Sequence, residues 1–273
     1  MRVRVVGRAF ELTHDDPACA QAGASALAQF TPTTGTSDWQ LRFRRGPQVA
    51  PREMSYVCTR ESEQRFSFVS AGAFSGWIDV GKHEADVVLE AEAAYGIAQR
   101  NVLRFALILD LQLTGGLVLH AASRIFEREA YVFAGRSEIG KSTLSRAFPP
   151  RDFLGDELCF IDEQQVVHRT PFFGEVPAPE GELTAPLAML VMLAQAPAVA
   201  LTRLSPAAAA RALLTTTVHL CHDPALTRVL VDRVAALCER LPVIHAGVPR
   251  FAAGELEPVM AALSTLAGFA RPA

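Results

Sequence analysis

The alternation of apolar and polar residues in the first third of the chain predicts strands. Leu41 and Phe43 alternate with arginines, and Phe66 and Phe68 flank a serine, so one face of each segment is apolar. We expect a β-rich N-terminal subdomain over residues 1–90. The expected strands are Arg2–Val6, Trp39–Arg44, Ser55–Thr59, Arg65–Ser70, Gly76–Val80 and Asp86–Glu90.

The spacing of apolar residues changes to a helical period after residue 90. Residues 92–113 carry a broad apolar face that includes Ile97, Leu103 and Leu107, and glycines at 115 and 116 end the segment. We expect a helix here. The change of pattern puts a domain boundary near residue 90, with a second domain over residues 91–273.

Two apolar runs follow with only a short charged segment between them. The first is Leu117–Phe126 and the second is Ala130–Ala134, separated by Glu127, Arg128 and Glu129. Three residues cannot hold a crossover helix, so the spacing predicts an antiparallel hairpin. The more usual arrangement in P-loop nucleoside triphosphatases is a parallel βαβ sheet.

The second run leads directly into a segment that matches the phosphate-binding pattern G-x-x-x-x-G-K-[ST]. Its residues are Gly135, Arg136, Ser137, Glu138, Ile139, Gly140, Lys141, Ser142 and Thr143. Gly135 and Gly140 allow tight turns that bring backbone N–H groups close to phosphate oxygens. Lys141 can reach the terminal phosphates, and the Ser142 hydroxyl can ligate Mg²⁺.

Lysine is scarce in this chain, which makes an accidental match to the pattern rarer. The sequence contains only two lysines, Lys82 and Lys141, and otherwise uses arginine. A compact point charge at the loop position is what phosphate binding requires. The alternative is a glycine-rich turn before an ordinary helix.

An acidic pair interrupts the next apolar segment. Asp156 and Glu157 fall inside Asp152–Ile161, which otherwise reads as a buried strand. Buried carboxylates need a partner, and Mg²⁺ on a nucleotide could supply one. One carboxylate could then hold the metal while the other accepts a proton from a hydroxyl nucleophile. The alternative is a solvent-exposed turn between two strands.

The end of the chain has clear helix-start signals. Ser205 before a proline predicts a helix over Ala207–Thr215, and Asp223 before a proline predicts another over Ala225–Arg240. Leu241–Ile244 reads as a late strand. Strands and helices thus mix throughout, and the expected fold class is α/β.

Composition excludes several classes of protein. The chain has 273 residues, a formal net charge of −3 and an apolar fraction of 50%, without a basic stripe that would indicate nucleic-acid binding. Pro186, Gln195 and Pro197 interrupt the apolar stretch Ala185–Leu201, so no membrane span is expected. Five scattered cysteines without a C-x-x-C pair indicate reduced thiols and a cytoplasmic protein.

From Gly116 to Ile161 the chain resembles the HPr serine kinase/phosphorylase family, whose fold is similar to that of ATP-dependent phosphoenolpyruvate carboxykinase. The shared pattern is an apolar strand with His120, a hairpin, the glycine loop, a helix and an acidic pair. His120 precedes Gly135 by 15 positions, which is similar to the family's spacing. On its own, a histidine in an apolar strand is more often a core residue.

The resemblance implies a role for each matching residue. Lys141 would bind the β- and γ-phosphates of ATP, and Ser142 would ligate Mg²⁺. Asp156 would be the general base or a metal ligand, Glu157 a second carboxylate on the metal, and His120 a neighbour of the reacting centre.

Three departures from the family pattern narrow the expected activity. Glu138 stands where the family often has glycine, the acidic pair is Asp-Glu where Asp-Asp is usual, and the glycine-rich signature of the bifunctional enzymes is missing. The resemblance therefore implies kinase chemistry, and whether any phosphorylase activity remains is left open by the sequence. Relatives of this kind occur beside peptide natural-product genes, so the acceptor need not be HPr.

The sequence thus predicts an ATP- and Mg²⁺-dependent kinase that phosphorylates a hydroxyl, with a serine of a small protein or peptide as the expected acceptor. Two alternatives remain open at this level. One is a small-molecule kinase, and the other is a non-catalytic nucleotide-binding module in a peptide-tailoring pathway. The oligomeric state is also open, a homo-oligomer included.

Overall fold

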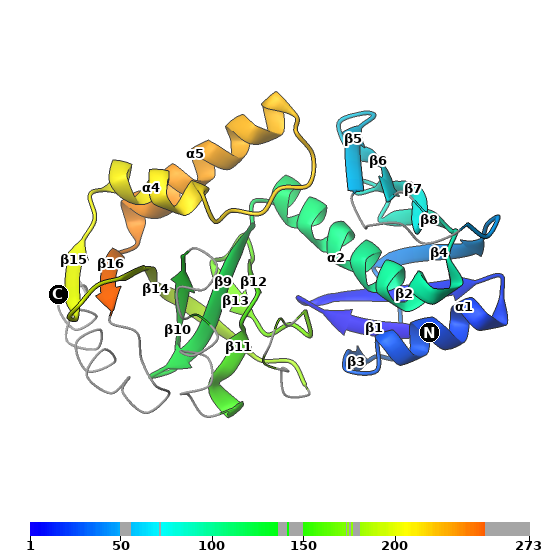
Figure 1. Cartoon of the computed structure of the whole chain (residues 1–273), viewed down its shortest axis with the longest axis horizontal. Helices are drawn as coiled ribbons and strands as arrows, with labels where there is room; N and C mark the ends of the chain where they lie inside the picture. Colours follow the sequence, from blue (N-terminus) through cyan, green and yellow to red (C-terminus); the bar gives the residue numbers. More distant parts are fainter. Residues whose placement is uncertain are drawn as a thin grey trace. The chain divides into compact units, whose positions relative to one another are not determined.

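The structure is a computed structural model that describes residues 1–49, 56–70, 72–135, 141, 150–172, 174, 176 and 181–248 (Figure 1). These residues form two compact units. The first contains residues 1–114 together with 219–227, and the second contains 115–218 together with 228–248. By its contacts the helix that follows residue 90, which the sequence analysis grouped with the second domain, lies in the first unit.

The first unit is built on one mixed sheet with the strand order β3-β1-β2-β4-β8-β7-β6-β5. β2 runs parallel to β4, and β4 runs parallel to β8, whereas the other neighbours are antiparallel. All six expected strands are present, and two more, β2 and β3, were not expected. The strands are β1 (Arg2–Val5), β2 (Arg8–His14), β3 (Thr31–Pro32), β4 (Trp39–Arg45), β5 (Tyr56–Arg60), β6 (Arg65–Ser70), β7 (Phe74–Asp79) and β8 (Glu84–Leu89).

Helix α2 joins this sheet to a second helix, α1. Phe105 of α2 contacts Phe68 of β6, with ring centroids 6.0 Å apart. On its other side the buried Gln99 donates a hydrogen bond to the carbonyl oxygen of Cys19 in α1 at 2.8 Å. Gly23 makes room for this contact, since a Cβ there would lie 2.2 Å from Gln99 Oε1. The helical segments are α1 (Pro17–Ala26), the short η1 (Glu92–Ala94) and α2 (Tyr95–Thr114).

The second unit contains another mixed sheet, with the order β10-β9-β12-β13-β14-β16-β15 and β11 beside β9. β14 also pairs with β10 in parallel, so the pairings β10–β9–β12–β13–β14 close into a ring. β14 belongs to the apolar stretch that the sequence analysis left without a strand. The strands are β9 (Leu117–Phe126), β10 (Glu129–Ala134), β11 (Phe153–Gly155), β12 (Leu158–Ile161), β13 (Val166–His168), β14 (Thr184–Gln195), β15 (Ala200–Arg203) and β16 (Val243–Val248).

The hairpin expected between the two apolar runs is confirmed. β9 and β10 pair antiparallel, with Ala121 opposite Ala134. Glu127 and Arg128 make the turn with φ angles of 49° and 72°, which is the left-handed geometry of a two-residue hairpin loop. The register of the hairpin places Ala134 at the end of β10, and the phosphate-loop pattern begins at the next residue, Gly135.

Helices cover one face of the second sheet. Leu119 of β9 and Val132 of β10 pack in one core with Leu213 of α4 and Val234 of α5. Ser205 caps α4 as expected, accepting a hydrogen bond from the backbone N–H of Ala208 at 3.4 Å. The helices are η2 (Pro150–Asp152), α4 (Pro206–Leu214) and α5 (Pro224–Arg240). In the part of the chain that the structure describes, none of the helices combines the length and apolar character needed to cross a bilayer.

Candidate functional site

The phosphate-loop pattern starts where β10 leaves the middle of the second sheet. Ala134, the last residue of β10, lies between Ala121 of β9 and Met192 of β14. Gly135 and Lys141 are described by the structure. The other predicted loop residues lie outside the described residues, and so does the helix expected after the loop. They are Arg136, Ser137, Glu138, Ile139, Gly140, Ser142 and Thr143.

Lys141 is buried and returns to the beginning of the loop. Its side chain is 7% exposed, and Nζ donates a hydrogen bond to the carbonyl oxygen of Gly135 at 2.9 Å. Burial lowers the pKa of Lys141, because removing the ammonium from water disfavours its charged form. The lysine is thereby held at the end of β10, which is where a phosphate cradled by such a loop would need a cation.

His120 is a neighbour of this lysine. Its backbone N–H bonds to the carbonyl oxygen of Thr216 at 2.7 Å, while its side chain is exposed and is therefore not part of the core. Desolvation of the ring lowers the pKa of His120, the positive charge of Lys141 lowers it further, and Glu157 opposes the shift. His120 is thus within electrostatic reach of two other predicted site residues, Lys141 and Glu157.

The acidic pair lies in a bend between β11 and β12, so the expected continuous strand is wrong at this point. Asp156 is nevertheless only 5% exposed. Its Oδ1 accepts the backbone N–H of Gly174 at 2.9 Å, and its Oδ2 accepts that of Val176 at 2.8 Å. The alternative of a solvent-exposed turn therefore fails for Asp156, which has backbone donors as partners.

Glu157 is more accessible than its neighbour. Its side chain is half-buried, and its backbone carbonyl accepts the N–H of Ala121 in β9 at 3.2 Å. This bond fixes the bend against the strand that carries His120. Of the acidic pair, Glu157 is the residue whose charge acts on His120.

Arg124 is a second buried cation that sequence reasoning missed. It lies four residues after His120, on the same face of β9, and is 1% exposed. Its guanidinium lies 4.0 Å from the ring centroid of Phe153. Burial lowers the pKa of Arg124, and the carboxylates of Asp156 and Asp152 counteract the shift. The available signal was an arginine inside an otherwise apolar run, because such a charge requires compensation.

The described residues are compatible with a nucleotide and Mg²⁺ held together. Among them, no group of three or more His, Cys, Asp or Glu side chains is arranged to hold a metal ion alone. Mg²⁺ on a nucleotide does not need such a cage, since phosphate oxygens and water supply most of its ligands beside one or two carboxylates. The buried Lys141, the start of a glycine loop at Gly135 and the half-buried carboxylate of Glu157 fit this arrangement.

No known family model matches the chain, and no curated protein sequence matches it.

Proposed function

We propose that this protein is an ATP- and Mg²⁺-dependent kinase that transfers the γ-phosphate to a hydroxyl group, with a serine of a small protein or peptide as acceptor. One observation carries the proposal. The single lysine of the second unit is buried at the end of β10 and bonded to Gly135, and its charge acts on His120, on which the charge of Glu157 also acts. The resemblance to HPr serine kinases, which rests on the same residues, supports it.

The roles of the side chains follow from their charges. Lys141 would bind and neutralise terminal phosphate oxygens, and Glu157 would provide a metal ligand together with the predicted Ser142. Mg²⁺, when bound to the nucleotide, supplies charge neutralisation across the phosphates. Asp156 would accept the hydroxyl proton, which is the role that the resemblance implies for the first carboxylate of the acidic pair.

The test is a nucleotide-binding titration with and without Mg²⁺. The chain offers a matched control, since Lys82 is the only other lysine and is exposed in the first unit. We expect Lys141→Ala to weaken binding by at least about tenfold, in line with the loss of a charge-assisted contact worth about 1.5–3 kcal/mol, and Lys82→Ala to bind as the wild type does. Absence of Mg²⁺-dependent binding in the wild type would remove the kinase proposal.

A nucleotide-binding module without catalysis is the second candidate, and one observation favours it. Both oxygens of Asp156 are engaged by backbone N–H groups, which gives this carboxylate a structural role that needs no chemistry. Phosphate transfer or hydrolysis should be measured on a panel of serine peptides and hydroxylated metabolites. Transfer to peptides alone would support the leading proposal, transfer to metabolites would support a small-molecule kinase, and binding without turnover would support the module.

A further inference from the structure

Two cysteines that lie far apart in the sequence meet within the first unit. Cys58 belongs to β5, and Cys221 belongs to residues 219–227, which lead into α5 and pack in the first unit. The two thiols form a hydrogen bond with each other. Cys58 is partly exposed, and Cys221 is 5% exposed. Two thiols in such contact can be joined by a disulfide.

An ion pair two residues further along each segment fixes this contact. Arg60 Nη1 lies 3.0 Å from Asp223 Oδ1, and both side chains are partly buried. Arg60 also donates to the carbonyl oxygens of Ser62 at 3.1 Å and Glu63 at 3.0 Å, so its guanidinium has a defined position. Asp223 Oδ1 accepts the backbone N–H of Leu226 at 2.9 Å at the start of α5. The segment that carries Cys221 is therefore held against β5 by more than the two thiols.

The surroundings of the pair determine how fast it can react. Burial raises the pKa of Cys58 to about 12. Burial also raises the pKa of Cys221, and the carboxylate of Asp223 adds to this increase. The backbone N–H and the positive charge of Arg60 act on Cys221 in the opposite direction, as does the thiol of Cys58. Because the thiolate is the reactive form, the pair reacts slowly near neutral pH and faster as the pH rises.

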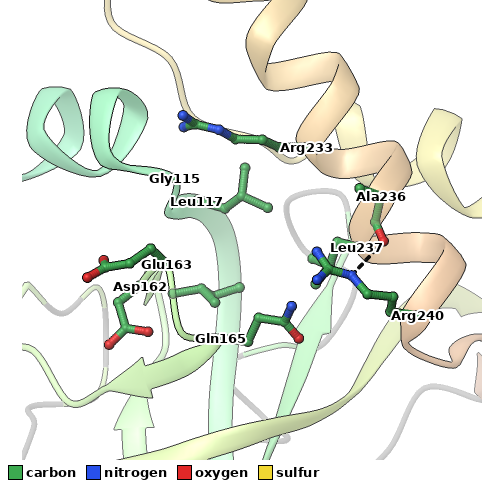
Figure 2. Close-up of a pocket in the computed structure, with 10 residues that line it drawn as sticks. Gly115, Leu117, Asp162, Glu163, Gln165, Arg233, Ala236, Leu237 and Arg240 are labelled. Atoms are coloured by element: carbon green, nitrogen blue, oxygen red, sulfur yellow. Dashed lines mark hydrogen bonds between the residues drawn. The ribbon is translucent and has the colours of Figure 1, made fainter.

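A single thiol on α5 offers a matched comparison. Cys238 is 5% exposed, as Cys221 is, and packs in the core of the second unit. Its neighbours Leu237 and Arg240 line a small pocket of about 90 Å³ (Figure 2). Among the residues that the structure describes, the lining of this pocket contains no cysteine. Exposure does not distinguish Cys221 from Cys238, and the distinguishing feature is the contact of Cys221 with the thiol of Cys58.

We propose that Cys58 and Cys221 form a site of reversible oxidation, at which hydrogen peroxide converts the two thiols into an intramolecular disulfide. Each sulfur loses its proton and one electron, the S–S bond forms, and the O–O bond of the peroxide breaks. The peroxide is thereby reduced to two molecules of water. The disulfide would fasten residues 219–227 covalently to β5, where the ion pair of Arg60 and Asp223 already holds them. A dithiol reductant would reverse the reaction.

The experiment is a disulfide map of the full-length protein after treatment with hydrogen peroxide at about pH 8.5, where thiolate begins to form. The remaining thiols are alkylated in denaturant before digestion with trypsin. Cys58 falls in tryptic peptide 53–60, Cys221 in 212–228 and Cys238 in 234–240. We expect the first two peptides to be joined, to weigh less than their sum by two hydrogens, and to separate in dithiothreitol, while Cys238 is recovered alkylated. An unlinked pair, a disulfide to another cysteine or a link between two molecules would overturn the proposal.

Variants test whether the fold positions the two thiols. Arg60→Gln removes the ion pair to Asp223 and is expected to slow disulfide formation by about two- to fivefold, as befits a partly exposed pair. Arg42→Gln is the matched control, because Arg42 is exposed on β4 of the same sheet, and Cys238→Ser should also react as the wild type does. Equal rates for Arg60→Gln and Arg42→Gln would contradict positioning by the ion pair. The wild-type map remains decisive if a variant fails to fold, and its readout does not depend on kinase activity.

Discussion

The carboxylate of Asp156 accepts a backbone N–H group on each oxygen, so it fixes the local chain as well as carrying charge. We predict that Asp156→Asn lowers the free energy of unfolding by about 1–3 kcal/mol, because one accepting oxygen becomes an amide group that donates. Urea denaturation measures this. An unchanged midpoint would mean that these bonds contribute nothing and that any loss of transfer in this variant is purely chemical.

Glu157→Gln provides the matched control for that substitution. The Glu157 side chain is half-buried, and the bond that anchors the bend uses its backbone carbonyl, which the substitution keeps. We expect its stability to remain within about 0.5 kcal/mol of the wild type while phosphate transfer falls. Together the two variants separate a structural from a chemical contribution of the acidic pair.

The lowered pKa of His120 predicts how stability depends on pH. In the folded state His120 binds its proton less readily than an unfolded histidine, whose pKa is about 6.5. The unfolded state therefore takes up more protons as pH falls through 6.5, and the free energy of unfolding decreases there. Urea midpoints between about pH 5 and pH 8 should show this slope in the wild type and a flatter one in His120→Gln. Identical slopes would contradict the assignment.

Among the elements, the bend between β11 and β12 depends on a close backbone approach. A Cβ on Gly155 would lie 3.0 Å from the carbonyl oxygen of Leu158 and 3.6 Å from Ser123 Oγ. We predict that Gly155→Ala destabilises the protein by about 1–3 kcal/mol, since backbone must move to admit the methyl group. Gly174→Ala is the control, because its nearest contact at 3.4 Å is ordinary van der Waals contact. Thermal unfolding compares the two, and equal costs would argue against a tight bend.

Elements with strong local signals were predictable from the sequence. Ser205 before a proline identified the start of α4, and the three-residue charged segment after Phe126 identified the hairpin. β14 was missed, since a long apolar run that contains Pro186 carries no strand alternation and its pairing with β10 and β16 comes from distant parts of the chain. β2 was missed because its few apolar residues lie between polar ends and its pairing with β4 comes from a later part of the chain.

The candidate site was predictable in composition and only partly in geometry. Lys141 and the acidic pair could be named from spacing, because the pattern G-x-x-x-x-G-K has a chemical reason. The burial of Asp156 and its bonds to Gly174 and Val176 depend on a segment almost twenty residues away, for which no local pattern exists. Arg124 could not be predicted for the same reason, because the carboxylates of Asp156 and Asp152 that stabilise its charge act on it only in the folded unit.

At the scale of the whole molecule, the chain forms two compact units, and the candidate site lies in the second. We therefore expect a bound nucleotide to protect the two units unequally from hydrogen exchange. A ligand at about 100 times its Kd stabilises the state that binds it by about 2.7 kcal/mol. We expect ATP with Mg²⁺ to slow hydrogen exchange in peptides from β9, β10 and β12 and to leave peptides from residues 1–89 almost unchanged. Equal protection in both regions would contradict a site confined to the second unit.

The scarcity of lysine also decides how the protein can be attached to surfaces and dyes. Lys82 is exposed in the first unit, whereas the amine of Lys141 is buried and bonded to Gly135. Acylating reagents consume accessible amines, so of the two lysines they will modify Lys82 under native conditions. Lys82 belongs to the first unit. Ordinary amine chemistry will therefore tether or label this protein by one unit and leave the lysine of the candidate site unmodified.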